Sequence, residues 1–336
     1  MPVDFEYDIK TLQNFASKHK NPPLFAFYGG EPLIRWEKMK EIIDALPESK
    51  FALQTNGTLV KRIPGKYVRR FHTILLSIDG TRDTTDAYRG KGTYARVLEG
   101  ARYLLENGFE GELIARMTVS VGADIEREVL HLIGTGMFNV IHWQLNTLWG
   151  IPEGTEIEEF ERWAEESYNP KLSNLIDWWL GRMREGNLEI IAPFAGVLHS
   201  ILSNEGVSLR CGAGSDFFAV TTDGRITACP IPPSLVFPIL GNIKESEPEE
   251  LSEQLGLISP CTECTYNNLC GGRCLYTNLT KHWGVEGFNV VCKTTKHLID
   301  ELRRIAPEVK KLIETKQIKL EMLKYPRVPN GVEVIP

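Results

Sequence analysis

Every cysteine of this chain lies in one stretch, and that placement constrains the fold more than any other feature. All seven fall between Cys211 and Cys292 in a sequence of 336 residues. Their order is Cys211, then Gly224-x4-Cys229, then Cys261-x2-Cys264-x5-Cys270-x3-Cys274, and finally Cys292. Thiolates grouped at such spacings bind soft metal ions and iron–sulfur clusters. We therefore expect this stretch to fold around inorganic centres.

Three kinds of cysteine chemistry compete for this pattern. Disulfides would suit a secreted chain, but the acidic N-terminal residues do not resemble a signal peptide, and an odd number leaves one thiol over. Structural zinc could use two cysteine pairs, although the run from Cys261 to Cys274 has too short a spacer for two zinc knuckles. Two [4Fe–4S] clusters, one with four protein thiolates and one with three, use all seven cysteines. We favour the clusters and keep zinc as the alternative.

Length, charge and hydropathy narrow the class of protein. A chain of 336 residues is long enough for two domains with a buried core. Its net charge of −6 argues against nucleic acid or an anionic membrane as the main partner, because both favour basic surfaces. No apolar run approaches the roughly 18 residues that span a bilayer. With reduced thiolates and no signal peptide, the sequence predicts a cytoplasmic protein.

Short apolar runs alternate with amphipathic segments through the first half of the chain. This alternation predicts βα units, and hence a parallel sheet buried on both faces. Several runs end in glycine or polar turns, which is where α/β folds place their ligands. An open or partial barrel is expected. The predicted strands are 24–28, 51–55, 73–78, 113–119 and 139–145, and the predicted helices are 7–19, 36–46, 93–107 and 124–135.

The second half has fewer periodic signals. A helical stretch from 155 to about 184 is expected to break at Asn169-Pro170. Residues 217–220 and 225–228 flank Asp223-Gly224, a strong signal for a β-hairpin. A basic helix over about 294–315 and an extended tail from Tyr325 to Pro336 complete the chain. The hairpin and the closing helix should therefore frame the cysteine-rich stretch.

The turn Gly29-Gly30-Glu31-Pro32 follows the first predicted strand. Taken alone, it is most simply a tight turn with an exposed acid. Two glycines also let a ligand approach the backbone closely, and a carboxylate suits an ammonium group. The turn is therefore a candidate ligand site at the end of a strand.

Together these motifs resemble radical S-adenosylmethionine (SAM) enzymes with a C-terminal SPASM domain, which carries auxiliary iron–sulfur clusters. All seven cysteine positions match the SPASM pattern, and the Gly29-Gly30-Glu31-Pro32 turn matches the GGEP motif that receives the SAM amino group. The resemblance implies an α/β fold: a partial (β/α)6 TIM-like barrel lacking its first strand, then a small cysteine-rich domain with a β-hairpin and C-terminal helices. The expected domains are 1–190 (barrel), 191–300 (SPASM) and 301–336 (helix and extended tail).

The same resemblance assigns the cysteines. It implies that four of them hold one auxiliary [4Fe–4S] cluster and that the other three hold a second, leaving one iron open. Sulfatase-maturing relatives have an acid directly after the second cysteine, as a proposed base, and this chain has Pro230 there. That departure argues against the sulfatase-maturation reaction. The four-cysteine set is Cys261, Cys264, Cys270 and Cys292, and the three-cysteine set is Cys211, Cys229 and Cys274.

SAM-side residues follow from the resemblance at the ends of the predicted strands. A surface ion pair and a ligand role stay open for Arg89. The expected SAM-binding residues are Gly29, Gly30, Glu31, Pro32, Asn56, Ser77, Asp79 and Arg116.

One family motif is missing: no CxxxCxxC for the SAM-cleaving cluster occurs, because no cysteine precedes Cys211. Either Met1 is an internal start and a longer form carries that third cluster, which we favour, or the chain is a non-catalytic homologue that binds a peptide or partner through iron–sulfur or zinc centres. As written, the chain is expected to be inactive in SAM cleavage. The complete enzyme would modify a peptide or small protein by hydrogen abstraction with a 5′-deoxyadenosyl radical, and a ferredoxin or flavodoxin would donate electrons. No catalytic side chain is assigned.

Overall fold

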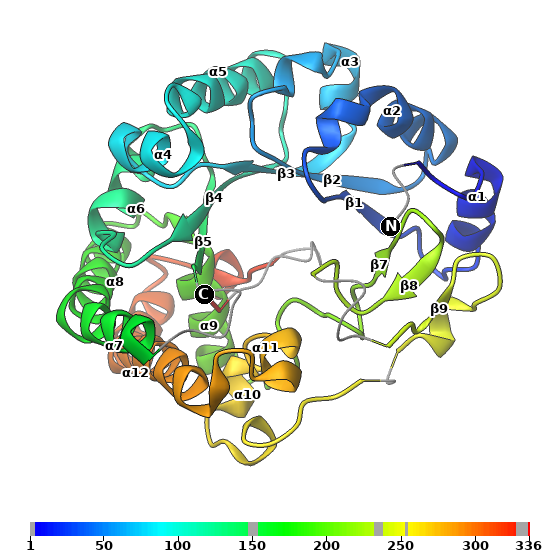
Figure 1. Cartoon of the computed structure of the whole chain (residues 1–336). Coiled ribbons are helices and arrows are strands. Elements are labelled where there is room, and N and C mark those ends of the chain that lie inside the picture. Colours follow the sequence, from blue (N-terminus) through cyan, green and yellow to red (C-terminus); the bar gives the residue numbers. More distant parts are fainter. Residues whose placement is uncertain (1–3, 147–153, 232–237, 253–254, 327–334) are drawn as a thin grey trace.

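The computed structural model describes residues 4–146, 154–231, 238–252, 255–326 and 335–336. Six parallel strands form the main sheet, in the order in which they occur along the chain. Helices cover its outer side, so the sheet and its helices form an open ring (Figure 1). The strands are β1 (Leu24–Phe27), β2 (Lys50–Thr55), β3 (Phe71–Ser77), β4 (Glu112–Val119), β5 (Val140–Leu145) and β6 (Ile190–Ile191).

The outer helices follow the strands one by one. They bury their apolar faces on the sheet, as the spacing of three and four between apolar residues requires. The helices before and between the strands are α1 (Ile9–Ser17), α2 (Trp36–Ala45), α3 (Gly65–Val68), α4 (Arg82–Arg89), α5 (Thr93–Glu106), α6 (Ile125–Gly134), α7 (Gly154–Trp163) and α8 (Asn169–Arg184).

Alternation along each strand separates an apolar outer face from a more polar inner face. On β5 the outward Trp143 is fully buried, stacks edge-on against Phe194 with ring centroids 5.7 Å apart, and donates a 2.9 Å hydrogen bond to Tyr168. Its neighbours His142 and Gln144 therefore face the interior of the ring. Arg116 of β4 is the register partner of His142. The interior of the ring thus carries polar side chains near the carboxyl ends of the strands.

The cysteine-rich region adds a small antiparallel sheet and several helices. Strands β7 (Ala219–Val220) and β8 (Arg225–Thr227) form the hairpin that Asp223-Gly224 predicted, and β9 (Gly241–Asn242) adds a third strand. Gly224 has φ +86°, which the turn requires. The remaining helices are α9 (Ala192–Ser203), α10 (Asn267–Cys270), α11 (Leu275–Thr280) and α12 (Gly284–Glu314).

The structure confirms the fold class and corrects several boundaries. All five predicted strands occur, but the short β6 was not predicted, because two residues carry no periodicity. The helix does not break at Asn169-Pro170: a π-helical turn over Ala164–Tyr168 joins α7 to α8, and Pro170 lies in the first turn of α8, where its missing N–H costs nothing. Helix α12 begins ten residues before the predicted start and runs past residue 300. Most of the predicted extended tail, residues 327–334, lies outside the described residues.

Domain boundaries at 190 and 300 remain predictions. Helix α12 packs against α7, α8 and α9, so the end of the chain is joined to the barrel helices. Within the described ranges, no helix is both long and apolar enough to cross a bilayer.

A buried carboxylate fixes the loop after β3. Glu128 of α6 accepts hydrogen bonds from the Thr81 N–H (2.5 Å), the Thr84 hydroxyl (2.8 Å) and Arg127. Burial by itself would raise the pKa of Glu128, but these donors outweigh it and hold the pKa below its usual value. Gly80, at φ +122°, packs so closely on Glu128 that a Cβ there would collide with the carboxylate.

The low pKa of Glu128 predicts a specific acid sensitivity. Its contribution to stability is complete above the unfolded-state pKa of about 4.3 and is lost as pH falls through the lower folded-state pKa. Glu128→Gln is expected to cost about 2 kcal/mol of unfolding free energy at pH 7, because buried donors lose a charged acceptor. The wild-type advantage should shrink at pH 3 in urea unfolding experiments. Exposed Glu106→Gln is the control, and an equal cost at both pH values would contradict this account.

Candidate SAM site and cysteine-lined cavities

The carboxylate of Glu31 links the ends of β1 and β2. It accepts hydrogen bonds from the Thr55 hydroxyl (2.7 Å), the Asn56 N–H (2.8 Å) and the Leu33 N–H (3.1 Å). A carboxylate has about four lone-pair sites, so these three bonds leave one for a further donor. The two glycines before it have φ of +100° and +48°, and no atom lies within 4 Å of where their Cβ atoms would be. Open space therefore borders this turn.

Asn56 and Pro32 shape the same corner of the ring. The side-chain oxygen of Asn56 accepts bonds from the Thr58 N–H (2.9 Å) and the Thr58 hydroxyl (2.7 Å), which fixes the turn after β2. Pro32 begins a short 3-10 helix over Pro32–Arg35, with Glu31 as its N-cap. These contacts hold the Glu31 carboxylate in place.

The carboxylate of Asp79 makes its contacts within the fold. Its buried carboxylate receives both Nε (2.6 Å) and Nη2 (2.8 Å) of Arg89, and also the Thr118 N–H (2.8 Å). Paired donors of this kind orient a carboxylate rigidly. This geometry gives Arg89 an internal ion-pair partner and ties α4 and β4 to the end of β3.

Ser77 and Arg116 are register partners on β3 and β4. Arg116 donates to its neighbour's carbonyl, Met117 O, at 2.9 Å, and it also lines a cavity of about 80 Å³. That cavity joins the inner face of the sheet, at Gln54, to Cys211, Cys229 and Pro230. The predicted SAM side and two of the three-set cysteines therefore share one space.

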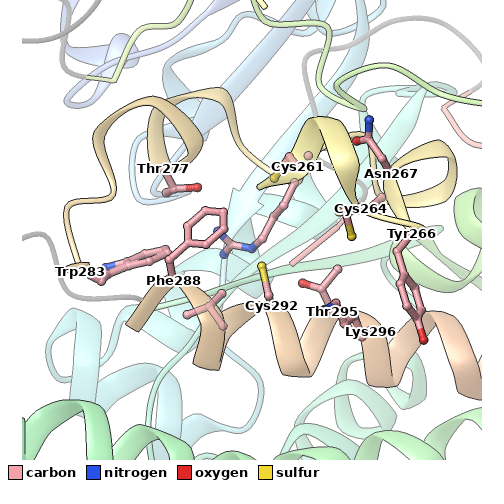
Figure 2. A pocket seen from close by; sticks show the side chains of 14 residues that line it. Cys261, Cys264, Tyr266, Asn267, Thr277, Trp283, Phe288, Cys292, Thr295 and Lys296 are labelled. Carbon is pink, nitrogen blue, oxygen red and sulfur yellow. The ribbon is translucent and has the colours of Figure 1, made fainter. Parts of the chain in front are cut away.

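Four cysteines line a second, mostly apolar cavity beside α12 (Figure 2). They come from the 3-10 turn Cys261–Glu263, the residue after that turn, α10, and the middle of α12. Figure 2 shows Cys261, Cys264 and Cys292 around a common space. This group is the predicted four-cysteine set: Cys261, Cys264, Cys270 and Cys292.

Ionisation of the thiols in this set is unfavourable unless a bound cation compensates the charge of the thiolates. Burial, and then proximity to Cys292 and Cys261, raises the pKa of Cys270 to about 12. Burial likewise raises the pKa of Cys261 and of Cys292. A cationic inorganic core would remove both penalties, because it neutralises the thiolates that it binds. The donor set therefore fits such a group.

The three cysteines of the other set do not all line one cavity. Cys211 and Cys229 line the 80 Å³ cavity, whereas Cys274 is the N-cap residue of α11 and does not line it. The segments nevertheless meet at Gly214, whose Cβ position lies 3.4 Å from Ala228 and 3.8 Å from Leu275. These two residues directly adjoin Cys229 and Cys274.

Sequence reasoning missed several polar residues around these cavities. Arg273 lines the four-cysteine cavity, and His142 and Gln144 face the ring interior. A signal for Arg273 was present in Cys270-Gly-Gly-Arg-Cys274, because paired glycines often mark an unusual backbone. The two inward residues of β5 had no such signal, since only the ring shows which face of β5 is inside.

Residues 4–133, from before α1 to the end of α6, match the family model described as the radical SAM superfamily. This segment belongs to the radical SAM superfamily. It carries the Glu31 turn and the polar ends of β2, β3 and β4. Proteins of this superfamily use SAM and iron–sulfur clusters.

Similarity extends beyond the radical SAM domain. The chain is 24% identical over 323 residues to a cysteine-type anaerobic sulfatase-maturating enzyme of Clostridium perfringens, covering 87% of this chain and 84% of that protein. A solved structure described as native anSMEcpe with bound AdoMet and Cp18Cys peptide matches with a TM-score of 0.70 at 19% identity, covering 92% of each chain. Streptococcus suis SuiB bound to S-adenosylmethionine matches with a TM-score of 0.50 at 15% identity, over 82% of this chain and 67% of SuiB. These structural likenesses show the shared fold.

Proposed function

We propose that this chain is the SAM-binding and auxiliary-cluster part of an enzyme that modifies a peptide or small protein. One observation carries the proposal: Arg116, on the polar inner face of the radical SAM domain, shares a cavity with Cys211 and Cys229. The chain's own residues would hold SAM at the Glu31 turn and enclose the substrate inside the ring. When bound and cleaved, SAM supplies the 5′-deoxyadenosyl radical that abstracts hydrogen from the substrate.

A peptide is the proposed substrate because related proteins bind or modify polypeptides. A solved relative carries AdoMet with a peptide, and the similar Clostridium perfringens protein matures sulfatases. The reaction proposed here differs from sulfatase maturation, since Pro230 follows Cys229 and lines the shared cavity. A proline ring can neither accept a substrate proton nor donate one.

We propose two auxiliary [4Fe–4S] clusters, held by the four-cysteine and three-cysteine sets. Support comes from the geometry: Cys261, Cys264, Cys270 and Cys292 line one cavity, and Cys211 and Cys229 line another. Thiolates gathered in this way are ligands for iron–sulfur clusters.

Cleavage of SAM needs cysteines that the 336 residues do not contain, because none precedes Cys211. We propose that a form carrying CxxxCxxC performs the complete reaction and that this chain alone binds SAM without cleaving it. The second candidate is a non-catalytic module that binds a peptide or partner through its cysteine-lined cavities. Ferredoxin or flavodoxin is the proposed electron donor, and a cytoplasmic location suits seven cysteines that form no disulfide.

Anaerobic reconstitution with iron and sulfide tests the proposal. We expect about eight irons per chain with visible charge-transfer absorption, together with SAM binding and no 5′-deoxyadenosine after reduction. Adding the three-cysteine motif to the chain should restore 5′-deoxyadenosine formation. Stoichiometric colourless zinc would refute the cluster assignment, and SAM binding that stays undetectable would refute the SAM site.

A further inference from the structure

The described end of the chain, Ile335–Pro336, lies inside the ring. Figure 1 places this end near the centre of the ring. Two side chains bind its main chain: Arg273 Nε donates to Pro336 O at 2.6 Å, and Gln144 Nε2 donates to Ile335 O at 3.2 Å. Ile335 is only 1% exposed. Two successive main-chain oxygens and one apolar side chain are thus held in the interior.

Arg273 is positioned at a cost in backbone energy. Its φ of +58° lies in the left-handed region, which is strained for a residue with a Cβ. Gly271 and Gly272 before it have φ of +67° and +78°, so the chain enters this conformation over three residues. Strain of this kind persists where the surrounding structure fixes it, and it is concentrated at functional sites.

The same guanidinium borders both the four-cysteine cavity and the main chain in the ring interior. Arg273 is 9% exposed, lies over the Trp283 ring at 5.7 Å, and lines the four-cysteine cavity. Its charge lowers the pKa of Cys270 and Cys292, against the stronger effect of burial. Arg273 therefore stands between the cysteines and the main chain that occupies the ring.

Gln144 supplies the opposite contact from the barrel side. It lies at the carboxyl end of β5, in register with Thr118 of β4. The two donors therefore hold adjacent residues from two sides, one from the sheet and one from the cysteine-rich region. Both contacts are to main-chain oxygens, which every peptide possesses, so neither depends on the sequence bound.

We propose that Arg273 and Gln144 are the main-chain anchor for a peptide substrate, and that Ile335–Pro336 occupies this anchor as an internal competitor. The ligand is an extended peptide that presents two successive main-chain oxygens next to an apolar side chain. This inference rests on the proposed peptide-modifying function and adds where and how the peptide is held. A peptide that binds must displace the chain's own residues.

Binding of a labelled peptide to the full chain tests the competition. The probe is a fluorescein-labelled synthetic peptide with the sequence of residues 327–336, followed by anisotropy. Ile335→Asp places a charge at a buried position and should release the internal residues, so the variant is expected to bind the probe about tenfold more tightly than wild type. Ile335→Gly, which removes the apolar contact without adding charge, should shift affinity in the same direction.

Anchor variants are then compared in the Ile335→Asp background. Gln144→Leu and Arg273→Lys should each weaken probe binding about tenfold, since leucine cannot donate a hydrogen bond and lysine lacks the Nε donor that reaches the main-chain oxygen. Gln13→Leu and Arg70→Lys are matched controls, because these side chains also donate to carbonyl oxygens (Ala45 O at 2.8 Å and Pro47 O at 3.2 Å) away from the ring interior. Thermal melting and iron content verify that each variant folds and loads normally.

Unchanged probe affinity in both Ile335 variants would overturn the competition, and unchanged affinity in Gln144→Leu and Arg273→Lys would overturn the anchor. Binding is measured without SAM cleavage. Failure of the enzymatic proposal would therefore leave a positive binding result standing. Conversely, if the anchor variants modify a peptide as well as wild type does, that result would refute the anchor alone.

Discussion

Cys270→Ala is expected to remove about half of the iron from the reconstituted chain, from about eight to about four atoms. Cys270 is one of four thiols around the cavity beside α12, and burial raises its pKa to about 12. The variant lacks one cluster ligand. Water cannot easily take the place of that ligand, because the lining of the cavity is mostly apolar. Iron and sulfide analysis with visible absorption measures the result.

Cys274→Ala should also halve the iron content, but by emptying the other set. The double variant should then lose nearly all iron, which a single shared site would not produce. Thr295→Val is the matched control: it changes a buried wall residue of the same cavity to one of nearly equal size and should keep all the iron. Full iron in Cys270→Ala, or equal loss in Thr295→Val, would contradict the ligand assignment.

Glu31→Gln is expected to weaken SAM binding by about tenfold to a hundredfold, the range for losing a hydrogen bond between charged groups. The carboxylate already accepts three bonds and has one acceptor site left, next to open space over Gly29 and Gly30. The amide removes the charge and turns an –NH2 group towards backbone donors. Isothermal titration calorimetry with SAM on the reconstituted chain measures the change.

Thr55→Val separates ligand binding from the internal role of Glu31. This variant removes the 2.7 Å bond that the Thr55 hydroxyl donates to Glu31 and the 3.1 Å bond that it accepts from the Gly57 N–H, but the carboxylate and its free acceptor site remain. We expect a small change in SAM affinity and a loss of about 1 kcal/mol in stability. If Thr55→Val weakens SAM binding as much as Glu31→Gln does, Glu31 acts only by holding the turn.

The two cavities suggest different tasks for the two cysteine sets. Cys211 and Cys229 share their space with Arg116 and the barrel interior, whereas the four-cysteine cavity lies beside α12. A group at the three-cysteine set would therefore lie nearer to the substrate. Arg273 lines the other cavity and still contacts the main chain inside the ring. Both sets thus border the space in which the proposed peptide would bind.

Local patterns determined much of the fold. Apolar runs ending in glycine or polar turns gave the five longer strands, and Asp223-Gly224 gave the hairpin, because turn and strand preferences depend on neighbouring residues. Strand β6 was missed for the opposite reason: Ile190–Ile191 is a strand only because β5 lies beside it. Likewise, the π-helical turn before Pro170 forms where α7 and α8 pack on α12.

The sequence by itself predicted that seven cysteines serve inorganic chemistry and determined that a glycine–glutamate turn ends a strand, since spacing and composition carry that information. Only the tertiary structure decided which side chains share a cavity. In the folded chain, Asp79 forms an ion pair with Arg89, and Glu31 keeps one acceptor site. Arg273 and Gln144 contact the main chain at the centre of the ring. Such contacts join residues tens to hundreds of positions apart, and their geometry comes from the packing of whole elements, which no local pattern encodes.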